Sequence, residues 1–339
     1  TRRRILTRPK ILLDPAFRPL GQLFAPVDLR RLKRAARVVW GRNADLPAAE
    51  LERHRDADAI ICGYWRYGSI AAFPRLKAVF EVGGGLPSPR AFDYAAAFRR
   101  GVTVASCAPG FGPAVAEMAL ALTLACTRTV VDTDRRFRTG RERWQFAETG
   151  ESWTLHGKTV GFIGYGGLAR NLRPLLEPFG VHVLAYDPWR APADLRREDA
   201  VPCGLDRLLR TARVIYVLAI PTPANRGLLN RRRLSLIHRN AVLILISRSH
   251  LVDFGALTDL VRRRRFRAGI DVFPREPLPK SHPIRRAPWA VLSAHKAGAM
   301  DEAMKLIGKW TVDDVLAVLR GRKPSHMQVA RPSLVARLA

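Results

Sequence analysis

Short apolar runs alternate with longer stretches of mixed polar and apolar residues along most of the chain. The first runs are "KILLD", "ARVVW", "DAIIC", "LKAVFEVG" and "VTVAS", and the later ones are "TVGFIG", "HVLAYD", "VIYVLAI", "AVLILIS", "AGIDVF" and "AVLSA". Continuous apolar runs of this length are typical of strands buried on both faces, and the helix-length stretches between them indicate crossover connections. The pattern predicts an α/β fold with doubly wound parallel sheets.

The chain is long enough for two such units. With 339 residues it exceeds the size of a typical single core. A Pro and Gly cluster, "CAPGFGP", ends the first series of strands, and a long apolar helix is expected from about Pro113. A second long helical stretch follows the last strand. We expect a first domain segment at residues 1–108, a second domain at residues 109–298, and a C-terminal segment at residues 299–339 that returns to the first domain.

The charge is strongly positive, with 58 Lys and Arg against 29 Asp and Glu and a formal net charge of +29. Such a balance invites a nucleic-acid hypothesis. The basic runs are scattered through predicted helices, however, without interleaved aromatic motifs, a zinc finger or a basic tail. Solvated helix faces therefore explain the charge better than a dedicated nucleic-acid surface.

Cysteine usage and hydropathy favour a cytoplasmic protein. The four cysteines form no CxxC pair or cluster of metal-ligand spacing, so we expect reduced thiols and no metal site. The basic N-terminal stretch is interrupted at residues 8–10 by Arg, Pro and Lys, which argues against a signal peptide. No apolar run approaches the ~18 residues of a membrane span, so no membrane association is expected.

The stretch "TVGFIGYGGLARNLRPLLEPFGVHVLAYDPW" combines a strand, a glycine turn, a helix, a second strand and an acid. Gly164, Gly166 and Ala169 occupy the GxGxxG/A positions: the first permits a tight bend, the second lets the backbone approach a pyrophosphate, and the third keeps helix and strand close. The whole unit predicts a dinucleotide site. Its turn contacts are expected from Gly164, Gly166, Gly167, Leu168 and Ala169.

The acid that completes this unit bears on the choice of cofactor. Asp187 lies at the end of the second strand, near the ~20-residue spacing of the acid that hydrogen-bonds the adenosine ribose 2′-hydroxyl. A carboxylate there would repel a 2′-phosphate, so NAD is favoured over NADP. Arg190 lies close in sequence and leaves NADP open.

Three polar features follow the later strands, where ligands bind in open α/β sheets. They are Arg248 in "ISRSHLVD", Asp271 and Glu276 in "AGIDVFPREPLP", and His295 in "VLSAHKAGAM". A histidine after an apparently buried strand is most often a packing residue. Reduction of a small keto acid, however, needs a cation for the carboxylate, a proton donor for the carbonyl oxygen and a hydride carrier. Arg248, His295 and NAD together meet those needs.

These motifs, in this order, resemble the D-isomer-specific 2-hydroxyacid dehydrogenases. The likeness extends from "LKAVFEVGGG" to "DDVLAVLRG" and includes "RGVTVASCAPG", "AVAEMALAL", "GKTVGFIGYGGLAR", "TPANRGLL", "LVDFGAL" and "HPI". The resemblance implies a flavodoxin-like substrate-binding domain at residues 1–108 and 299–339, a Rossmann NAD-binding domain at residues 109–298, and a cleft between them. It also implies a homodimer that associates through the NAD-binding domain and the "AVAEMALAL" helix.

The resemblance also implies roles for the later polar residues. Arg248 would anchor and polarise the substrate, His295 would be the acid/base, and Glu276 would pair with it. A carboxylate beside an imidazole fixes its tautomer and favours the imidazolium form. Asp271 matches an aspartate near the nicotinamide amide. The predicted cofactor contacts from this region are Ser247, Asp271 and Gly298.

Candidate substrate contacts in the first domain follow two of its strands. The backbone N–H groups of Gly83, Gly84 and Gly85 are expected to receive the substrate carboxylate, although a plain tight turn accounts equally well for three glycines. The resemblance places a second substrate-side segment at "CGYWRYG", with Tyr64, Trp65 and Arg66 as candidates. Packing of the aromatic pair at a domain edge is the alternative for that segment.

Several positions depart from the family pattern. Ser249 and His250 follow the arginine where glycine is usual, and Ala294 precedes the histidine where proline is frequent. Lys296 follows the histidine in place of an apolar residue, and its ammonium would oppose protonation of His295 if it pointed inward. "GGLPSP" also replaces a more polar turn. These changes leave the substrate open.

The sequence predicts an NAD(H)-dependent oxidoreductase that interconverts a small 2-oxo acid and the D-2-hydroxy acid by hydride transfer. Glyoxylate, hydroxypyruvate and phosphoglycerate-type substrates all remain candidates. The alternative is a catalytically weak or inactive dinucleotide-binding protein of the same fold that uses its basic surface to contact nucleic acid. The joint presence of Arg248, Glu276 and His295 favours the enzyme.

Overall fold

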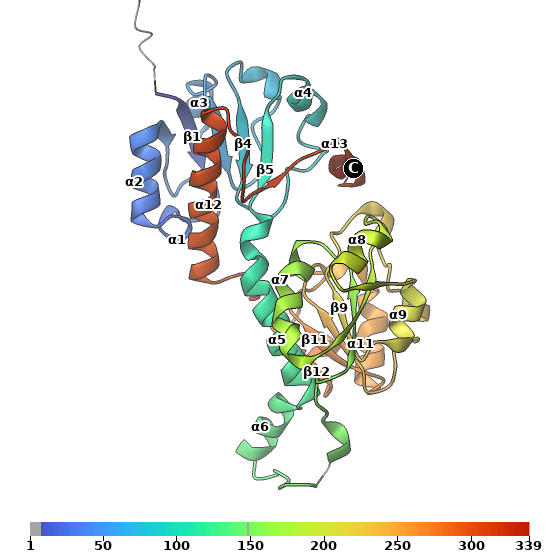
Figure 1. The fold of residues 1–339 in the computed structure, drawn as a ribbon. Helices are drawn as coiled ribbons and strands as arrows, with labels where there is room; N and C mark the ends of the chain where they lie inside the picture. Colours follow the sequence, from blue (N-terminus) through green and yellow to red (C-terminus); the bar gives the residue numbers. More distant parts are fainter. Residues whose placement is uncertain (1–7, 148, 339) are drawn as a thin grey trace, which may run out of the picture. The chain divides into compact units, whose positions relative to one another are not determined.

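The computed structural model describes residues 8–147 and 149–338, and it divides into two compact units, each built around its own sheet (Figure 1). Unit 1 contains the described residues up to Phe111 together with those from Ala299 onward, and unit 2 contains Gly112–Gly298. The first boundary therefore falls after Phe111 rather than after residue 108. The basic N-terminal stretch at residues 1–7 lies outside the described residues.

The sheet of unit 1 has six strands in the order β13-β5-β4-β3-β1-β2. Its strands are β1 (Lys10–Asp14), β2 (Arg37–Trp40), β3 (Ala59–Cys62), β4 (Ala78–Glu81), β5 (Thr103–Ser106) and β13 (Gln328–Val329). The first five are parallel, in the flavodoxin-like order 2-1-3-4-5. The short β13 pairs antiparallel with β5, and no apolar run had predicted it.

The helices of unit 1 complete its two outer layers. They are α1 (Leu20–Leu23), α2 (Pro26–Ala35), α3 (Ala48–Glu52), α4 (Tyr94–Arg99), α12 (Asp301–Leu319) and α13 (Pro332–Leu338). The long α12 packs against α1, α2, β3 and β4, so the C-terminal segment belongs to unit 1. On the opposite face of the sheet, Leu12, Ile60 and Val79 lie in a core that also includes Trp65 and Tyr94.

Unit 2 contains a seven-stranded, fully parallel sheet in the order β12-β11-β10-β9-β6-β7-β8. Its strands are β6 (Thr159–Ile163), β7 (His182–Tyr186), β8 (Val201–Pro202), β9 (Val214–Val217), β10 (Val242–Leu245), β11 (Arg267–Ile270) and β12 (Ala290–Leu292). Strand order reverses beside β6, as in a Rossmann fold. The predicted class of two doubly wound α/β domains is confirmed for both sheets.

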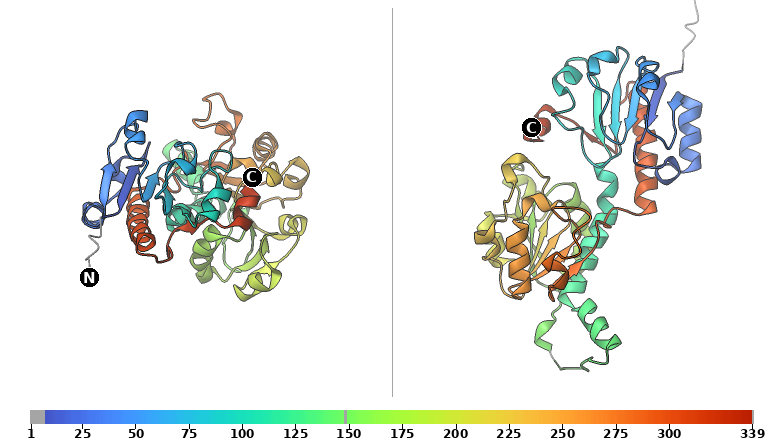
Figure 2. Two further views of the ribbon diagram at one scale, coloured as in Figure 1. Left: turned by 90° about the horizontal axis from the view of Figure 1, so that it is seen from above. Right: turned by 180° about the vertical axis from the view of Figure 1, so that it is seen from behind.

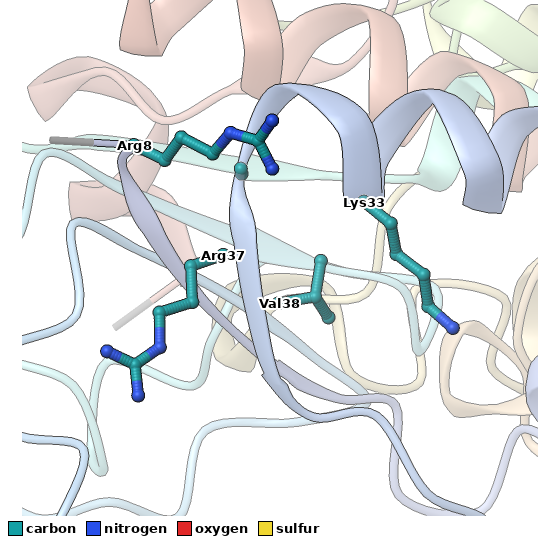
Figure 3. Close-up of a pocket in the computed structure, with 5 residues that line it drawn as sticks. Arg8, Lys33, Arg37 and Val38 are labelled. Atoms are coloured by element: carbon teal, nitrogen blue, oxygen red, sulfur yellow. The ribbon is translucent and has the colours of Figure 1, made fainter. Parts of the chain in front are cut away.

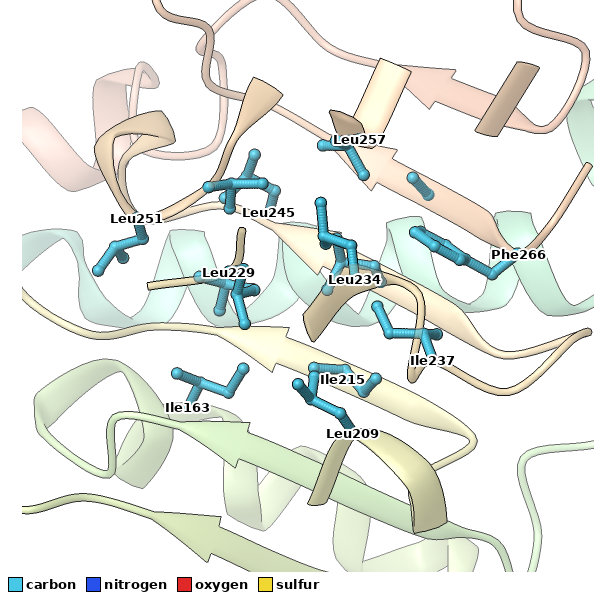
Figure 4. Packing of buried hydrophobic residues seen from close by; sticks show 14 of the residues in the cluster. Ile163, Leu209, Ile215, Leu229, Leu234, Ile237, Leu245, Leu251, Leu257 and Phe266 are labelled. Carbon is cyan, nitrogen blue, oxygen red and sulfur yellow. The ribbon is translucent and has the colours of Figure 1, made fainter. Parts of the chain in front are cut away.

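Helices cover both faces of this second sheet (Figure 2). They are α5 (Gly112–Thr127), α6 (Val130–Arg138), α7 (Gly167–Leu176), α8 (Pro192–Arg197), α9 (Leu205–Thr211), α10 (Arg231–Leu234) and α11 (Phe254–Arg262). A close-packed cluster on one face joins strands to helices α9, α10 and α11, with Ile215, Leu234 and Leu257 fully buried (Figure 4). Side-chain caps fix where the later helices begin: Asp253 accepts a hydrogen bond from the Ala256 N–H at the start of α11.

By length and composition alone, the helix Ala108–Thr127 is apolar enough to cross a membrane. This contradicts the expectation that no apolar run approaches the length of a membrane span. Half of the helix's most apolar window is buried, and within unit 2 the α5 part packs against α7, β10 and β11. Packing in a protein core accounts for this apolar composition.

All four cysteines are free thiols, and three of them are buried. Burial raises the pKa of Cys107 and of Cys126 to about 12, so both stay protonated near neutral pH. Among the described residues, no group of three or more His, Cys, Asp or Glu side chains has the geometry to hold a metal ion.

Gly308 lies in the interior of α12 where this helix crosses the chain after α1. A Cβ atom at this position would overlap the carbonyl oxygen of Leu23 and approach the Cα atom of Phe24 at 3.2 Å. Only a residue without a side chain therefore allows this approach of two backbones. The crossing fixes α12 in unit 1.

Replacing Gly308 with Ala is expected to lower the free energy of unfolding of unit 1 by ~1–3 kcal/mol through this overlap. An ordinary helix-interior Gly→Ala change goes the other way, stabilising by up to ~1 kcal/mol. Thermal or denaturant unfolding measures the change. Gly21→Ala in α1 is the control, because no atom lies within 4 Å of the added Cβ; equal effects of both substitutions would contradict the prediction.

Candidate active site

The glycine turn of unit 2 joins β6 to α7. Gly164 has a φ of +88°, and a Cβ on it would lie 2.5 Å from the Cα atom of Ala219. Ala169 is fully buried under the turn. Gly166 and Gly167 are exposed at the start of α7, and a Cβ on either would meet nothing within 4 Å. The first turn of α7 thus presents free space and helix N–H groups, which suits a pyrophosphate. Leu168 is half-buried beside it.

Asp187 at the end of β7 is tied to this turn. Its carboxylate accepts the Tyr165 N–H at 2.8 Å and the Trp189 N–H at 2.9 Å. The neighbouring Arg190 donates to both carboxylate oxygens of Glu198, at 2.6 and 3.1 Å. This ion pair holds the pKa of Glu198 below its usual range. The arginine that kept NADP open is therefore engaged with a carboxylate of the same unit.

Two further observations fit a bound dinucleotide. The Ser247 hydroxyl, at the end of β10, is buried and has no hydrogen-bond partner among the described residues. An orphaned buried hydroxyl is costly unless a ligand completes its bonding. The strained Gly164 and the open Gly166 provide the close backbone approach that such a ligand requires. The residues present therefore fit NAD, with Gly298 partly exposed in the segment after β12.

His295 and Glu276 form a direct pair. The Nδ1 atom of His295 lies 2.6 Å from Oε2 of Glu276, and Oε1 accepts the Phe273 N–H at 2.9 Å. Burial raises the pKa of Glu276, but the hydrogen bonds from His295 and Phe273 and the charges of His295 and Arg248 outweigh it and hold the pKa below its usual range. The His295 side chain remains 44% exposed, so its Nε2 edge is accessible to a reactant.

The backbone at His295 is held in a left-handed conformation, with φ +54°. Its N–H donates to the carbonyl oxygen of Asp271 at 2.8 Å, and the Asp271 carboxylate accepts the N–H groups of Lys296 at 2.8 Å and Ala297 at 3.1 Å. Asp271 is fully buried. Both of its oxygens thus hold the histidine loop, and the predicted contact of Asp271 with the nicotinamide stays a prediction.

Two other details of the histidine segment bear on what the sequence predicted. Strand β12, which precedes His295, is the edge of the sheet and is only half-buried, whereas the apolar run had indicated a buried strand. The side chain of Lys296, whose direction the sequence left open, is exposed. His295 therefore does not pack in a core.

Arg248 lies on the segment between β10 and the turn Ser249–Leu251. It is exposed, and its guanidinium donates to the Ser247 carbonyl oxygen at 2.8 Å. Its charge reaches Glu276, so the structure brings Arg248, Glu276 and His295 together within unit 2. The unusual His250 places its Nε2 atom 2.7 Å from the Thr222 carbonyl oxygen, which links the Arg248 segment to the loop after β9.

In unit 1, the Gly83–Gly85 turn follows β4. A Cβ on Gly83 would overlap the Gly63 carbonyl oxygen, and Gly84 has a φ of +133°. The close packing of two backbones therefore requires the first glycine, and the turn conformation favours the second. Gly85 is exposed, with nothing within 4 Å of its Cβ position, so the far end of the turn has room for a ligand.

The segment after β3 divides into core and surface. Trp65 is 6% exposed and packs edge-on against Tyr67 and Phe92, so its prediction as a pocket residue is wrong and core packing holds. Arg66 donates to the buried Asp14 at 2.9 and 3.1 Å, which leaves it as a structural ion pair rather than an open substrate contact. Tyr64 is exposed and stacks on Phe17.

The sequence reading missed two charged residues at the Gly83–Gly85 turn. Arg18, from the loop after β1, donates to the carbonyl oxygens of Val82 at 2.7 Å and Gly83 at 3.1 Å. Glu81 closes β4 and is buried. A charged residue at the end of the apolar run "AVFE" was a detectable signal for Glu81. No local pattern points to Arg18, because its partners are distant in sequence.

A surface depression lies at the free edge of the unit 1 sheet, lined by Ala36, Val38 and the cations Arg8, Lys33 and Arg37 (Figure 3). It includes none of the predicted site residues. Arg37 is on the edge strand β2, where a charged side chain discourages pairing with other chains.

Comparison with known proteins agrees with this arrangement. Residues 120–297 match the family described as "D-isomer specific 2-hydroxyacid dehydrogenase, NAD binding domain". A glyoxylate reductase from Thermofilum pendens is 30% identical over 333 residues, covering 94% of each chain. The crystal structure of a phosphoglycerate oxidoreductase from Rhizobium etli has a TM-score of 0.81 at 30% identity and covers 96% of this chain and 99% of that one.

A D-3-phosphoglycerate dehydrogenase from Mycobacterium leprae is 34% identical over 254 residues, 74% of this chain. The match covers 47% of that protein, so the chain spans about half the length of the phosphoglycerate dehydrogenases that it resembles. The relatives also include glyoxylate reductases of similar length, and the family match covers residues 120–297 of unit 2. The chain therefore belongs to the D-isomer specific 2-hydroxyacid dehydrogenase family, as its motifs had predicted.

Proposed function

We propose that the protein is an NAD(H)-dependent oxidoreductase that interconverts a small 2-oxo acid and the corresponding D-2-hydroxy acid. The observation that carries this proposal is the 2.6 Å contact between His295 and Glu276, on the same unit as the dinucleotide turn and within reach of the Arg248 charge. The names of the relatives, glyoxylate reductase and D-3-phosphoglycerate dehydrogenase, support a 2-oxo or 2-hydroxy acid as the substrate class. We further propose a cytoplasmic location.

His295 is the proposed acid/base. With Nδ1 directed at the Glu276 carboxylate, the free Nε2 edge donates its proton to the carbonyl oxygen during reduction. In the oxidation direction the neutral imidazole takes the proton of the substrate hydroxyl. Glu276 is the positioning residue: it selects the tautomer and compensates the positive charge of the imidazolium. Bound NADH supplies a hydride to the carbonyl carbon, and NAD⁺ accepts it in reverse.

Arg248 is the proposed substrate anchor. Its planar guanidinium has donors beyond the one used on the Ser247 carbonyl, and it suits a carboxylate bidentately. The N–H groups of the Gly83–Gly85 turn are proposed to contribute to carboxylate binding. Of the three candidates after β3, Trp65 packs in the core and Arg66 pairs with Asp14, so only Tyr64 remains open to a substrate.

Oxidation of NADH, measured against a panel of 2-oxo acids, tests the proposal. His295→Ala is expected to lower kcat by roughly 100-fold to 10,000-fold, because a positioned acid is lost. Arg248→Ala is expected to lower kcat/KM, and, unlike His295→Ala, to do so in part by raising KM, because the substrate loses its anchor. His182→Ala is the matched control, since this exposed histidine lies at the opposite, amino end of β7.

Failure of the wild-type protein to reduce any panel member, together with tight NADH binding, would instead support an inactive dinucleotide-binding protein of the same fold. Salt-sensitive retention on DNA, with a steep dependence on salt concentration, would support the nucleic-acid alternative.

NADH is the expected cofactor. Asp187 opposes a 2′-phosphate, and Arg190 is paired with Glu198 rather than free to bind one. We expect kcat/KM for NADH to exceed that for NADPH by at least roughly tenfold, the factor that ~1.4 kcal/mol supplies. Glu198→Gln is expected to narrow this ratio, because it releases Arg190. A wild-type preference for NADPH would contradict the assignment.

A homodimer is proposed through unit 2. Val130 and Val131 at the start of α6, Phe137 at its end and Trp144 beyond it are at least half exposed, and the last two stack edge to face. Exposed apolar clusters of this kind mark protein interfaces. Phe137→Asp combined with Trp144→Asp is expected to convert a dimer into a monomer in light scattering. Phe17→Asp in unit 1 is the control, and a monomeric wild-type protein would refute the dimer.

A further inference from the structure

Glu81 occupies an unusual place in unit 1. It is the last residue of β4, at the carboxyl end of the parallel strands, with Cys62 of β3 and Ser106 of β5 beside it in register. Only 7% of its surface is exposed. Its Oε1 atom lies 3.7 Å from the position that a Cβ would take on Gly83. The carboxyl group therefore lies against the turn that we propose as a receptor for the substrate carboxylate.

No cation compensates this carboxyl group among the described side-chain pairs. The groups that act on it or that it acts on are the Trp65 backbone N–H after β3, the thiols of Cys62 and Cys107, and the phenol of Tyr94 on α4. All of these side chains are neutral near pH 7. Asp14, also at the carboxyl end of the sheet, is by contrast bound by Arg66.

Burial without a cation has a direct electrostatic consequence. It raises the pKa of Glu81 to about 7, against an ordinary value of 4.5, and the Trp65 N–H opposes this rise only in part. Glu81 is therefore neutral in acid solution and becomes a buried anion as the pH rises through 7. Nothing in the proposed hydride-transfer chemistry uses this titration.

The turn also carries one cation. Arg18 donates to the carbonyl oxygens of Val82 and Gly83 and lies over the rings of Phe17 and Phe111, at 5.1 and 5.5 Å. Desolvation lowers the pKa of Arg18 below its usual range, and Arg18 has no carboxylate partner among the described residues. The charges at the turn are thus one fixed positive charge and one titratable negative charge.

On the basis of the proposed function, we propose that Glu81 is a specificity-determining residue that admits 2-oxo acids with a single negative charge and opposes those with a second anionic group. Arg248 is the proposed anchor of the first carboxylate, so Arg18 is the cation of the described turn that could offset a second carboxylate or phosphate. When Glu81 is ionised, its negative charge cancels that of Arg18, and the turn offers no net positive charge to the second anion. The substrate class is therefore a small monoanionic 2-oxo acid with a neutral or hydroxyl-bearing tail.

The pH dependence follows from the direction of the titration. Above pH 7 Glu81 is ionised and the discrimination against a second anion is complete. As the pH falls through 7, a proton neutralises Glu81 and the discrimination fades. A neutral isostere at this position abolishes the discrimination at every pH.

The test compares hydroxypyruvate with oxaloacetate, which carries a carboxylate in place of the hydroxyl, for the wild-type protein and for Glu81→Gln at pH 6 and pH 8. Removing one charge a few ångströms from the second anion is expected to raise the oxaloacetate to hydroxypyruvate ratio of kcat/KM roughly tenfold at pH 8. The ratio is expected to change little at pH 6. Where oxaloacetate turns over too slowly to measure, its inhibition constant against hydroxypyruvate supplies the same comparison.

Glu52→Gln is the matched control. Glu52 is an exposed, ionised acid of the same unit that precedes β3, at the amino end of the sheet, and it pairs with Arg55. Its substitution is expected to leave the substrate ratio unchanged at both pH values. An equal change in both variants would show that the effect is long-range and not specific to the turn, and would overturn the proposal.

A second measurement is independent of turnover. Because the folded-state pKa of Glu81 lies above its unfolded value of 4.5, its contribution to stability is present at low pH and is lost as the pH rises from about 4.5 to 7. The melting temperature of Glu81→Gln relative to the wild type is therefore expected to rise between pH 5 and pH 8. A constant difference would contradict the titration on which the proposal depends.

The outcomes separate the two proposals. If the wild-type protein reduces hydroxypyruvate and Glu81→Gln leaves the substrate ratio unchanged at pH 8, the specificity role of Glu81 is wrong and the proposed function stands. If the wild-type protein reduces no 2-oxo acid, the proposed function fails and the specificity role fails with it.

Discussion

The buried carboxylate of Asp271 is the interaction on which the chemistry of unit 2 depends. Asp271 directly follows β11 and is fully buried, where an unpaired charge would be costly. Its oxygens are satisfied by the N–H groups of Lys296 and Ala297, and its carbonyl oxygen accepts the N–H of His295. Asp271 thus accepts three hydrogen bonds, which fix the successive peptide N–H groups of residues 295–297. They stabilise the left-handed backbone of His295, a conformation that costs ~1–2 kcal/mol for a side chain of this kind.

Two other aspartates hold loops in the same way, one after a strand of unit 2 and one on a helix of unit 1. Asp187 accepts N–H groups from Tyr165 and Trp189 and so joins the glycine turn to the end of β7. Asp314, buried on α12, accepts the N–H groups of Ser325, His326 and Met327. Loop N–H groups lack the partners that sheets and helices provide, and an aspartate offers two acceptors in a short side chain. Rigid loops therefore follow from buried acids in both units.

The strands and the dinucleotide turn could be predicted because their signals are local. Continuous apolar runs indicate strands that are buried on both faces. Gly164 and Asp187 both belong to a single βαβ unit, so their spacing is visible in a short stretch of sequence. The pairing of His295 with Glu276 was available only through the family resemblance, since no spacing rule connects the two. The buried position of Trp65 could not be predicted, because an aromatic residue after a strand serves a core and a pocket equally well. The contacts of Asp271 with the histidine loop could not be predicted either, because its partners are backbone groups, which leave no mark in the sequence.

The distribution of departures from the family pattern has a physical logic. In unit 2 the substituted positions Ser249, His250 and Lys296 surround an Arg248, Glu276 and His295 set that is intact, and His250 uses its ring to join two loops. In unit 1 the turn after β4 carries Glu81 and Arg18, whose charges we propose act on the substrate without taking part in proton or hydride transfer. Catalysis requires a fixed geometry of the reacting groups. Discrimination between substrates requires only that the charges of the protein interact differently with each substrate. On the proposed function, a change of charge at the Gly83–Gly85 turn would therefore alter which 2-oxo acid is accepted while Arg248, Glu276 and His295 stay unchanged.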